Sequence, residues 1–198
     1  MKVEPVTLEG DAVRLEPLTV EHFPRLCEVG LEPELWRWTT TDVRTPEDLR
    51  RYLEQALREQ REGRSLPFAT VERATGKAAG STRFGNIEPA HRKAEIGWTW
   101  IGTPWQRSAI NTEAKYLMLR YAFEIWGCVR VELKTNAMNY RSRTAILRIG
   151  AKEEGTLRKH MISERGASRD TVYFSILDTE WPQVKLGLEG RMRRSVAT

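Results

Sequence analysis

The sequence has few cysteines, few histidines and no long apolar run, and each shortage excludes a class of protein. Its 198 residues include two cysteines, Cys27 and Cys128, and three histidines, with no metal-binding, redox or disulfide spacing. We therefore expect reduced thiols and no metal. No apolar segment approaches the about 20 residues that a membrane helix needs. The first residues, Met-Lys-Val-Glu-Pro, lack a signal segment, which predicts a cytoplasmic protein with no membrane partner.

Length and charge limit the organisation and the partners. The length is typical of a single domain, which we expect to span 1–198, with a core over about 8–178 and a tail over 179–198. The net charge of +5 suits either a nucleic-acid surface or an anionic ligand. Because the basic residues are spread along most of the chain and no reader motif is present, we expect no nucleic-acid partner.

Hydrophobic periodicity predicts an α+β fold. Alternating patterns predict strands at about 12–18, 66–71, 78–84, 93–101, 129–135, 152–161 and 171–176. Amphipathic or capped segments predict helices after Thr19, from Thr45 to near Gly63, over a central stretch that Gly127 ends, and after Asn139. This order predicts a central, mostly antiparallel mixed sheet of about seven strands, flanked by about four helices, with one strand-helix-strand crossover.

The chain is organised around residues 95–126. The strand-like run Glu95–Ile101 is followed by a loop over Gly102–Thr112 and then by the central helix. A helix N-terminus after a strand and a short loop presents free N–H groups and the positive end of the helix dipole. This stretch therefore predicts a binding site for an anionic cofactor.

Two segments resemble the GNAT N-acetyltransferases. The first is Trp105-Gln106-Arg107-Ser108-Ala109-Ile110-Asn111-Thr112-Glu113-Ala114, after its strand. The second, Asn139-Tyr140-Arg141-Ser142 with Gly150-Ala151, resembles the branch with the ribosomal-protein N-terminal acetyltransferases (RimJ/RimL-like). The resemblance implies a GNAT fold, acetyl-CoA as cofactor, and direct attack by a primary amine, either a protein N-terminus or a small-molecule amine. It also implies that a strand ending in Trp98–Ile101 opens beside a gap for the cofactor.

The resemblance also implies which residues bind the cofactor. The loop motif is Q/R-x-x-G-x-G/A, in which Gln106 fits while Ala109 and Asn111 occupy the two glycine positions. Ala109 fits only if its φ is negative, whereas Asn tolerates positive φ best after glycine. The expected cofactor-binding residues are Trp100, Ile101, Gln106, Arg107, Ser108, Ala109, Ile110, Asn111, Thr112, Asn139 and Ser142.

Glu95 and Ser142 are the predicted catalytic residues. Glu95, an acid at the start of an apolar strand, is our candidate general base; the alternative is an exposed carboxylate paired with Lys93 or Arg92. By resemblance, Ser142 would hydrogen-bond the sulfur of the leaving thiolate, because the family's tyrosine position holds Ile146. The alternative is a helix serine that satisfies backbone groups. Weaker candidates are Tyr140 as the acid and His160 as the base.

The tryptophans and the departures from the motif leave further alternatives open. Trp36, Trp38 and Trp98 are expected to line an acceptor cleft, or else to fill the core. Because Ala109 and Ile146 depart from family positions, a non-catalytic CoA-binding module is the alternative to an enzyme. Apolar C-terminal strands would allow a homodimer.

Overall fold

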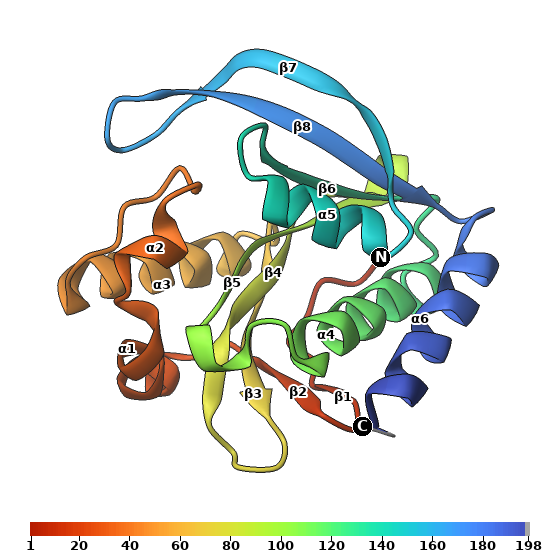
Figure 1. Ribbon diagram of the computed structural model, residues 1–198, viewed down its shortest axis with the longest axis horizontal. Helices are drawn as coiled ribbons and strands as arrows, with labels where there is room; N and C mark the ends of the chain where they lie inside the picture. The colour runs from red at the N-terminus through yellow and green to blue at the C-terminus, as the bar shows by residue number, and fades with distance from the viewer. Residues whose placement is uncertain (197–198) are drawn as a thin grey trace.

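The computed structural model describes residues 1–196, which form one eight-stranded mixed sheet with helices on both faces (Figure 1). The strands are β1 (Leu8–Glu9), β2 (Val13–Pro17), β3 (Leu66–Glu72), β4 (Ala78–Glu88), β5 (Lys93–Ile101), β6 (Arg130–Asn136), β7 (Lys152–Ile162) and β8 (Ser168–Leu177). The helices are α1 (Phe23–Gly30), α2 (Pro33–Trp36), α3 (Pro46–Arg61), α4 (Ala109–Arg120), α5 (Tyr140–Arg148) and α6 (Trp181–Val196). The predicted α+β class is confirmed, and the last two residues of the expected domain lie outside the described chain.

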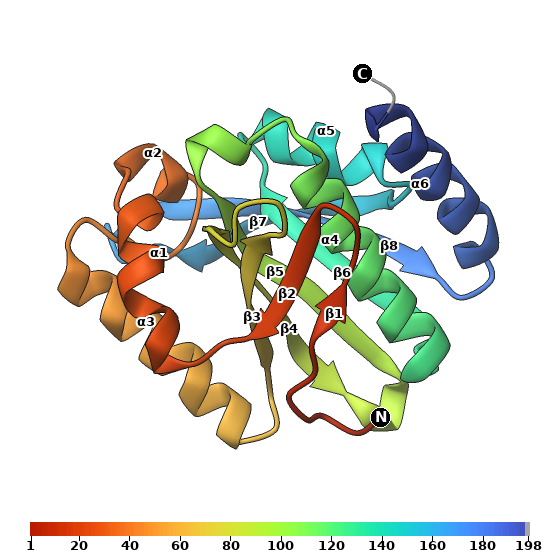
Figure 2. The ribbon, with the colours of Figure 1, turned by 90° about the horizontal axis from the view of Figure 1, so that it is seen from below.

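The sheet has the order β1-β2-β3-β4-β5-β6-β8-β7. Its neighbours are antiparallel except β5 and β6, which are parallel and are joined by the predicted crossover through α4. Figure 2 shows α1 and α3 on one side of the sheet and α4 and α6 on the other. No helix within residues 1–196 is long and apolar enough to cross a membrane.

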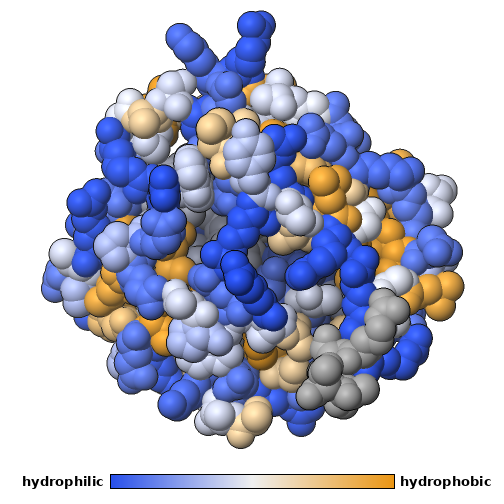
Figure 3. All heavy atoms as spheres, viewed as in Figure 1, coloured by the Kyte–Doolittle hydropathy of each residue, from blue (hydrophilic) through white to orange (hydrophobic). Residues whose placement is uncertain are grey.

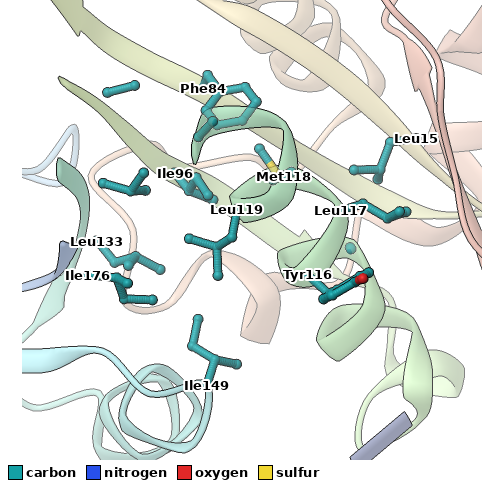
Figure 4. Close-up of a cluster of buried hydrophobic side chains, with 14 of the residues drawn as sticks. Leu15, Phe84, Ile96, Tyr116, Leu117, Met118, Leu119, Leu133, Ile149 and Ile176 are labelled. Atoms are coloured by element: carbon teal, nitrogen blue, oxygen red, sulfur yellow. The ribbon is translucent and has the colours of Figure 1, made fainter. Parts of the chain in front are cut away.

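Two apolar cores lie on opposite faces of the sheet. On one face, α4 packs its fully buried side chains Met118 and Leu119 against strand residues such as Ile96 and Leu133 (Figure 4). On the other face, α1 and α3 pack around Trp36 and Trp100. Burial of this apolar area is the main stabilising term of both layers, at roughly 25 cal/mol per Å².

The sequence predictions missed several elements near the ends of the chain. Trp36 belongs to the short helix α2, where a loop was expected. The expected tail is instead α6, whose Trp181 Nε1 donates to Glu124 Oε1 at 3.0 Å. The helical spacing of Trp181, Val184 and Leu188 was the available signal. The central helix also begins earlier than expected, at Ala109, and its last turn is a π-helical segment before the predicted stop.

A β-bulge interrupts β5 at Trp98, which has φ 50°. The register with β4 shifts between Ser81 and Arg83, where β5 has one extra residue. The extra residue reverses the alternation, so Ile96 faces α4 while Trp100 faces α3. Regular alternation would place Ile96, Trp98 and Trp100 on one face, so the sequence pattern alone gives the wrong faces here.

Strands β5 and β6 separate soon after they meet. They pair over only three positions, from Lys93 with Arg130 to Glu95 with Glu132. Beyond Glu95 the bulged end of β5 has no β6 partner in the register. The opening that the resemblance implied beside Trp98–Ile101 is therefore present in the fold.

Candidate active site

The N-terminus of α4 lies at the end of this opening. Ser108 is its N-cap, and the Ser108 hydroxyl accepts a hydrogen bond from the Ile110 amide at 3.3 Å. The Gln106 side chain ties the loop to β5 by donating to the Ile101 carbonyl at 2.7 Å. The first turn of α4 therefore follows a loop that is held in place, and its N-terminal amides make it a candidate anion site.

The two substituted glycine positions fit this geometry. Ala109 and Asn111 both lie within α4, and neither has a positive φ; in this loop the positive φ belongs to Arg107, at 64°. Helical φ values suit alanine and asparagine, so the departure from the motif causes no backbone strain. The condition that we set for Ala109 is met.

Polar groups from α4 and α5 surround this anion site. Arg141 donates through Nη2 to Gln106 Oε1, and Arg148 Nη2 lies 3.5 Å from Thr112 Oγ1. Arg148 was missed by the sequence analysis, because only the fold places the C-terminal turn of α5 beside α4. The Asn111 side-chain oxygen is buried and has no hydrogen-bond partner within the described chain. An orphaned buried oxygen beside free amides is consistent with a polar ligand here.

Two predicted cofactor contacts have their side chains in the core. Trp100 is 4% exposed and packs against Trp36, with ring centroids 5.5 Å apart. The Ile110 side chain is also buried. Both residues can therefore offer a ligand only their backbone groups.

Helix α5 places Ser142 near the start of its first turn. Asn139 is the N-cap, and its Oδ1 accepts from the Ser142 amide at 3.1 Å. The Ser142 hydroxyl forms no hydrogen bond within residues 1–196, so it is not used to cap the helix. Tyr140 is 63% exposed, whereas Ile146 is buried. Among these three α5 residues, Ser142 is the one whose half-buried hydroxyl has no hydrogen-bond partner in the described chain.

Glu95 is buried and ion-paired. Its side chain is 3% exposed, and its Oε2 lies 2.9 Å from Lys134 Nζ and accepts from Asn86 Nδ2 at 2.7 Å. The alternative of an exposed carboxylate paired with Lys93 or Arg92 is therefore wrong. Sequence reasoning missed Lys134, although the alternation of β6 places it on the face away from the apolar core.

Of the three predicted acceptor-site tryptophans, two are half-buried and one lies in the core. Trp36 is 1% exposed and donates through its indole to the Gly30 carbonyl at 2.7 Å, so it belongs to the core. Trp98 is half-buried, with the Arg83 guanidinium 4.5 Å from its ring centroid. Trp38 is also half-buried, in the loop after α2, and its carbonyl accepts from Arg169.

The tip of the β7–β8 hairpin closes over the loop after α2. Arg165 Nη1 lies 2.9 Å from Asp42 Oδ1, and Arg165 Nη2 donates to three backbone carbonyls, one at the end of α2 and two in the loop after it. The Glu164 amide donates to the Thr40 carbonyl at 2.8 Å. These contacts join the C-terminal hairpin to the N-terminal helical layer. Figure 3 shows hydrophilic side chains around a recess near the middle of the face seen in Figure 1.

Lys115, which sequence reasoning also missed, lies beneath the bulge. Its Nζ donates to Thr99 Oγ1 at 2.7 Å and to Thr82 Oγ1 at 3.2 Å. Burial lowers the pKa of Lys115 to about 7, because the charged form loses its hydration. On the other face, the Tyr52 hydroxyl donates to the Trp98 carbonyl at 3.0 Å. The bulge is therefore held from both sides of the sheet.

The geometry agrees with what is found in related proteins. Residues 12–152 match the family described as acetyltransferase (GNAT) domain. The chain belongs to the GNAT acetyltransferase family. It is 36% identical over 106 residues, 54% of this chain and 57% of the relative, to the "Putative ribosomal N-acetyltransferase YdaF" of Bacillus subtilis.

Solved GNAT structures match nearly the whole chain. A GCN5-related N-acetyltransferase from Brucella melitensis is 33% identical, with a TM-score of 0.88 over 96% of this chain and 86% of that one. Mycobacterium smegmatis RimJ, in complex with CoA-disulfide, is 26% identical, with a TM-score of 0.78 over 96% and 93%. These similarities confirm the GNAT fold and the resemblance to the RimJ/RimL-like branch.

The GNAT family uses acetyl-CoA, and the orphaned Asn111 oxygen and the free α4 amides fit such a ligand. The residues described hold no cluster that could bind a metal ion.

Proposed function

We propose that this GNAT protein transfers the acetyl group of acetyl-CoA to a primary amine by direct attack. The observation that carries the proposal is the opening between β5 and β6, which leads to the free N-terminal amides of α4. The cofactor supplies an activated acetyl thioester. Amide groups between Arg107 and Thr112 would bind its pyrophosphate, and the edge of β5 that has no β6 partner beyond Glu95 would align its arm as an added strand does.

The reaction requires a neutral amine and a stabilised thiolate. The nitrogen forms a bond to the carbonyl carbon, the carbon–sulfur bond breaks, and one proton passes from nitrogen to solvent or to a base. Glu95 is the proposed acceptor of that proton, directly or through water, and Lys134 and Asn86 hold its carboxylate in place. Ser142, whose hydroxyl is unengaged, is proposed to hydrogen-bond the departing sulfur.

A two-stage assay tests the function and the non-catalytic alternative. Acetyl-CoA should raise the melting temperature, and a panel of primary amines should then release free CoA thiol. The panel should include peptides with free N-termini, because the similarity to a putative ribosomal N-acetyltransferase supports a protein acceptor. Stabilisation by acetyl-CoA without turnover on any amine would favour a CoA-binding module, and no stabilisation would contradict both readings.

We also propose a cellular location and an assembly. A cytoplasmic location fits a ribosomal-protein substrate. A homodimer is supported by β7, which pairs only with β8 within the described sheet and exposes nearly all of its residues at the edge. Light scattering at several concentrations tests the dimer, and a monomer mass throughout would contradict it. We also propose that residues 1–198 act as a single domain, which limited proteolysis can test.

A further inference from the structure

Arg169 on β8 has more hydrogen-bonding capacity than the protein uses. Its Nη1 donates to the Trp38 carbonyl at 3.4 Å, and its buried Nε has no partner within the described residues. The loop that contains Trp38 is already anchored by Arg165, with an ion pair and three backbone hydrogen bonds. This loop therefore does not need Arg169 as a further anchor. The side of a guanidinium that carries Nε is also the side that binds a carboxylate through two parallel hydrogen bonds.

A second orphaned group lies on the same face of the strand. Thr171 is two residues from Arg169, so both side chains point to the same side of β8. Thr171 Oγ1 is buried and also has no hydrogen-bond partner in the described chain. An unsatisfied buried polar atom costs about 1–3 kcal/mol, so two neighbouring ones indicate that another molecule supplies their partners.

The charges on this face do not balance. Lys134 pairs with Glu95 at 2.9 Å, and the Arg83 guanidinium, also near Trp98, pairs with Glu59 at 2.9 Å. Burial lowers the pKa of Arg169, and Glu95 and Tyr173 act in the opposite direction. Glu95 is the ion-pair partner of Lys134. Within the described chain, the Arg169 guanidinium therefore has no carboxylate of its own on this face.

We propose that the acceptor is a primary amine that also carries a carboxylate, which Arg169 and Thr171 bind. This inference rests on the proposed acetyl transfer and names the substrate class of the same site. The carboxylate would neutralise the unbalanced charge and satisfy both orphaned atoms. The nearby cations would also disfavour the ammonium form of the amine, which has to be neutral to attack. The same carboxylate chemistry is found in a free amino acid and in an acidic residue near a peptide N-terminus.

Matched acceptor pairs test the proposal with acetyl-CoA and the full chain. One pair is 4-aminobutanoate and its carboxamide; the other is the peptides Ser-Asp-Ala and Ser-Asn-Ala with amidated C-termini. We expect the acid of at least one pair to have a kcat/KM on the order of ten- to a hundredfold above its neutral partner. The pair that shows the difference identifies the source of the carboxylate.

Variants then assign the difference to β8. R169Q should remove most of the acid preference, and R169K should restore only part of it because lysine lacks the guanidinium fork. R158Q, at an exposed position on β7, is the matched control and should keep the full preference.

Calorimetric titration of each acid and amide into the CoA-bound protein provides a readout without turnover. Equal kcat/KM for acids and amides, or equal binding where turnover is absent, would overturn the proposal of a carboxylate-bearing acceptor. In that case acetyl-CoA binding and turnover of any amine would still establish the acetyltransferase activity.

Discussion

Lys115 Nζ lies 2.7 Å from Thr99 Oγ1, in a buried space between α4 and the bulged end of β5. The ammonium group has no carboxylate partner among the described ion pairs, and its second acceptor is another hydroxyl, that of Thr82. A buried amine with only neutral partners is costly when it is charged. The support beneath the bulge is therefore sensitive to pH.

The stability of the protein should depend on pH through Lys115. The folded-state pKa of Lys115, about 7, is below its ordinary value of 10.5, so between these values the unfolded chain binds more protons and stability rises with pH. Relative to K115M, the wild-type free energy of unfolding should rise by up to about 1.4 kcal/mol per pH unit across this window, and the advantage should be lost as pH falls through about 7. Urea unfolding of both proteins at four pH values measures it. A constant difference would show that Lys115 does not titrate in this window.

A proline at position 109 should separate cofactor binding from folding. Ala109 is the first residue of α4, where proline is tolerated, and Ser108 before it has the extended conformation that proline requires. A109P removes one free N–H from the anion site, so acetyl-CoA affinity should fall on the order of tenfold or more, while the melting temperature of the free protein changes little. A109G keeps the N–H and is the matched control. Calorimetric titration with acetyl-CoA checks both, and equal affinity for A109P and A109G would exclude this amide from the site.

Removing the Glu95 carboxylate should affect both rate and stability. E95Q leaves Lys134 without its ion-pair partner in a mostly buried position, which should cost about 3 kcal/mol. The double variant E95Q/K134M removes both charges and should recover much of that stability. If Glu95 is the base, kcat should stay lowered on the order of a hundredfold or more in both proteins. A stable double variant with wild-type kcat would contradict a role as base.

Ser142 and its neighbour Asn139 should give opposite results. S142A removes a hydroxyl that takes no part in capping, so kcat should fall about tenfold or more without loss of stability. N139A removes the cap of α5 and should lower the free energy of unfolding by about 1 kcal/mol. Initial rates and thermal melts of the two variants measure both effects. A destabilised S142A with normal kcat per folded molecule would favour the structural alternative for this serine.

Much of the fold could be predicted from local sequence patterns. The N-caps Thr45 and Asn139 and the alternation in β6 are local signals, and each appears in the structure as expected. These signals work because a helix or strand is selected by which face it buries.

The site was harder to predict, because its decisive features depend on distant residues. The left-handed φ of Trp98 has no signature in its own sequence, and the bulge reversed the faces of the residues that follow it. The partner of Glu95 lies 39 positions away on β6, and the nearer Lys93 pairs with Glu88 instead. Trp36 appeared to be in a loop, and only the packing of α2 against Trp100 shows that it is buried.

Strands β5 and β6, which join the two halves of the described sheet, pair at three register positions. A ligand that lies along the unpaired end of β5 would complete this junction and so would act as a structural element of the fold. At a concentration one hundred times its dissociation constant, such a ligand adds about 2.7 kcal/mol to stability. The resistance of this chain to proteases would then rise with the concentration of acetyl-CoA.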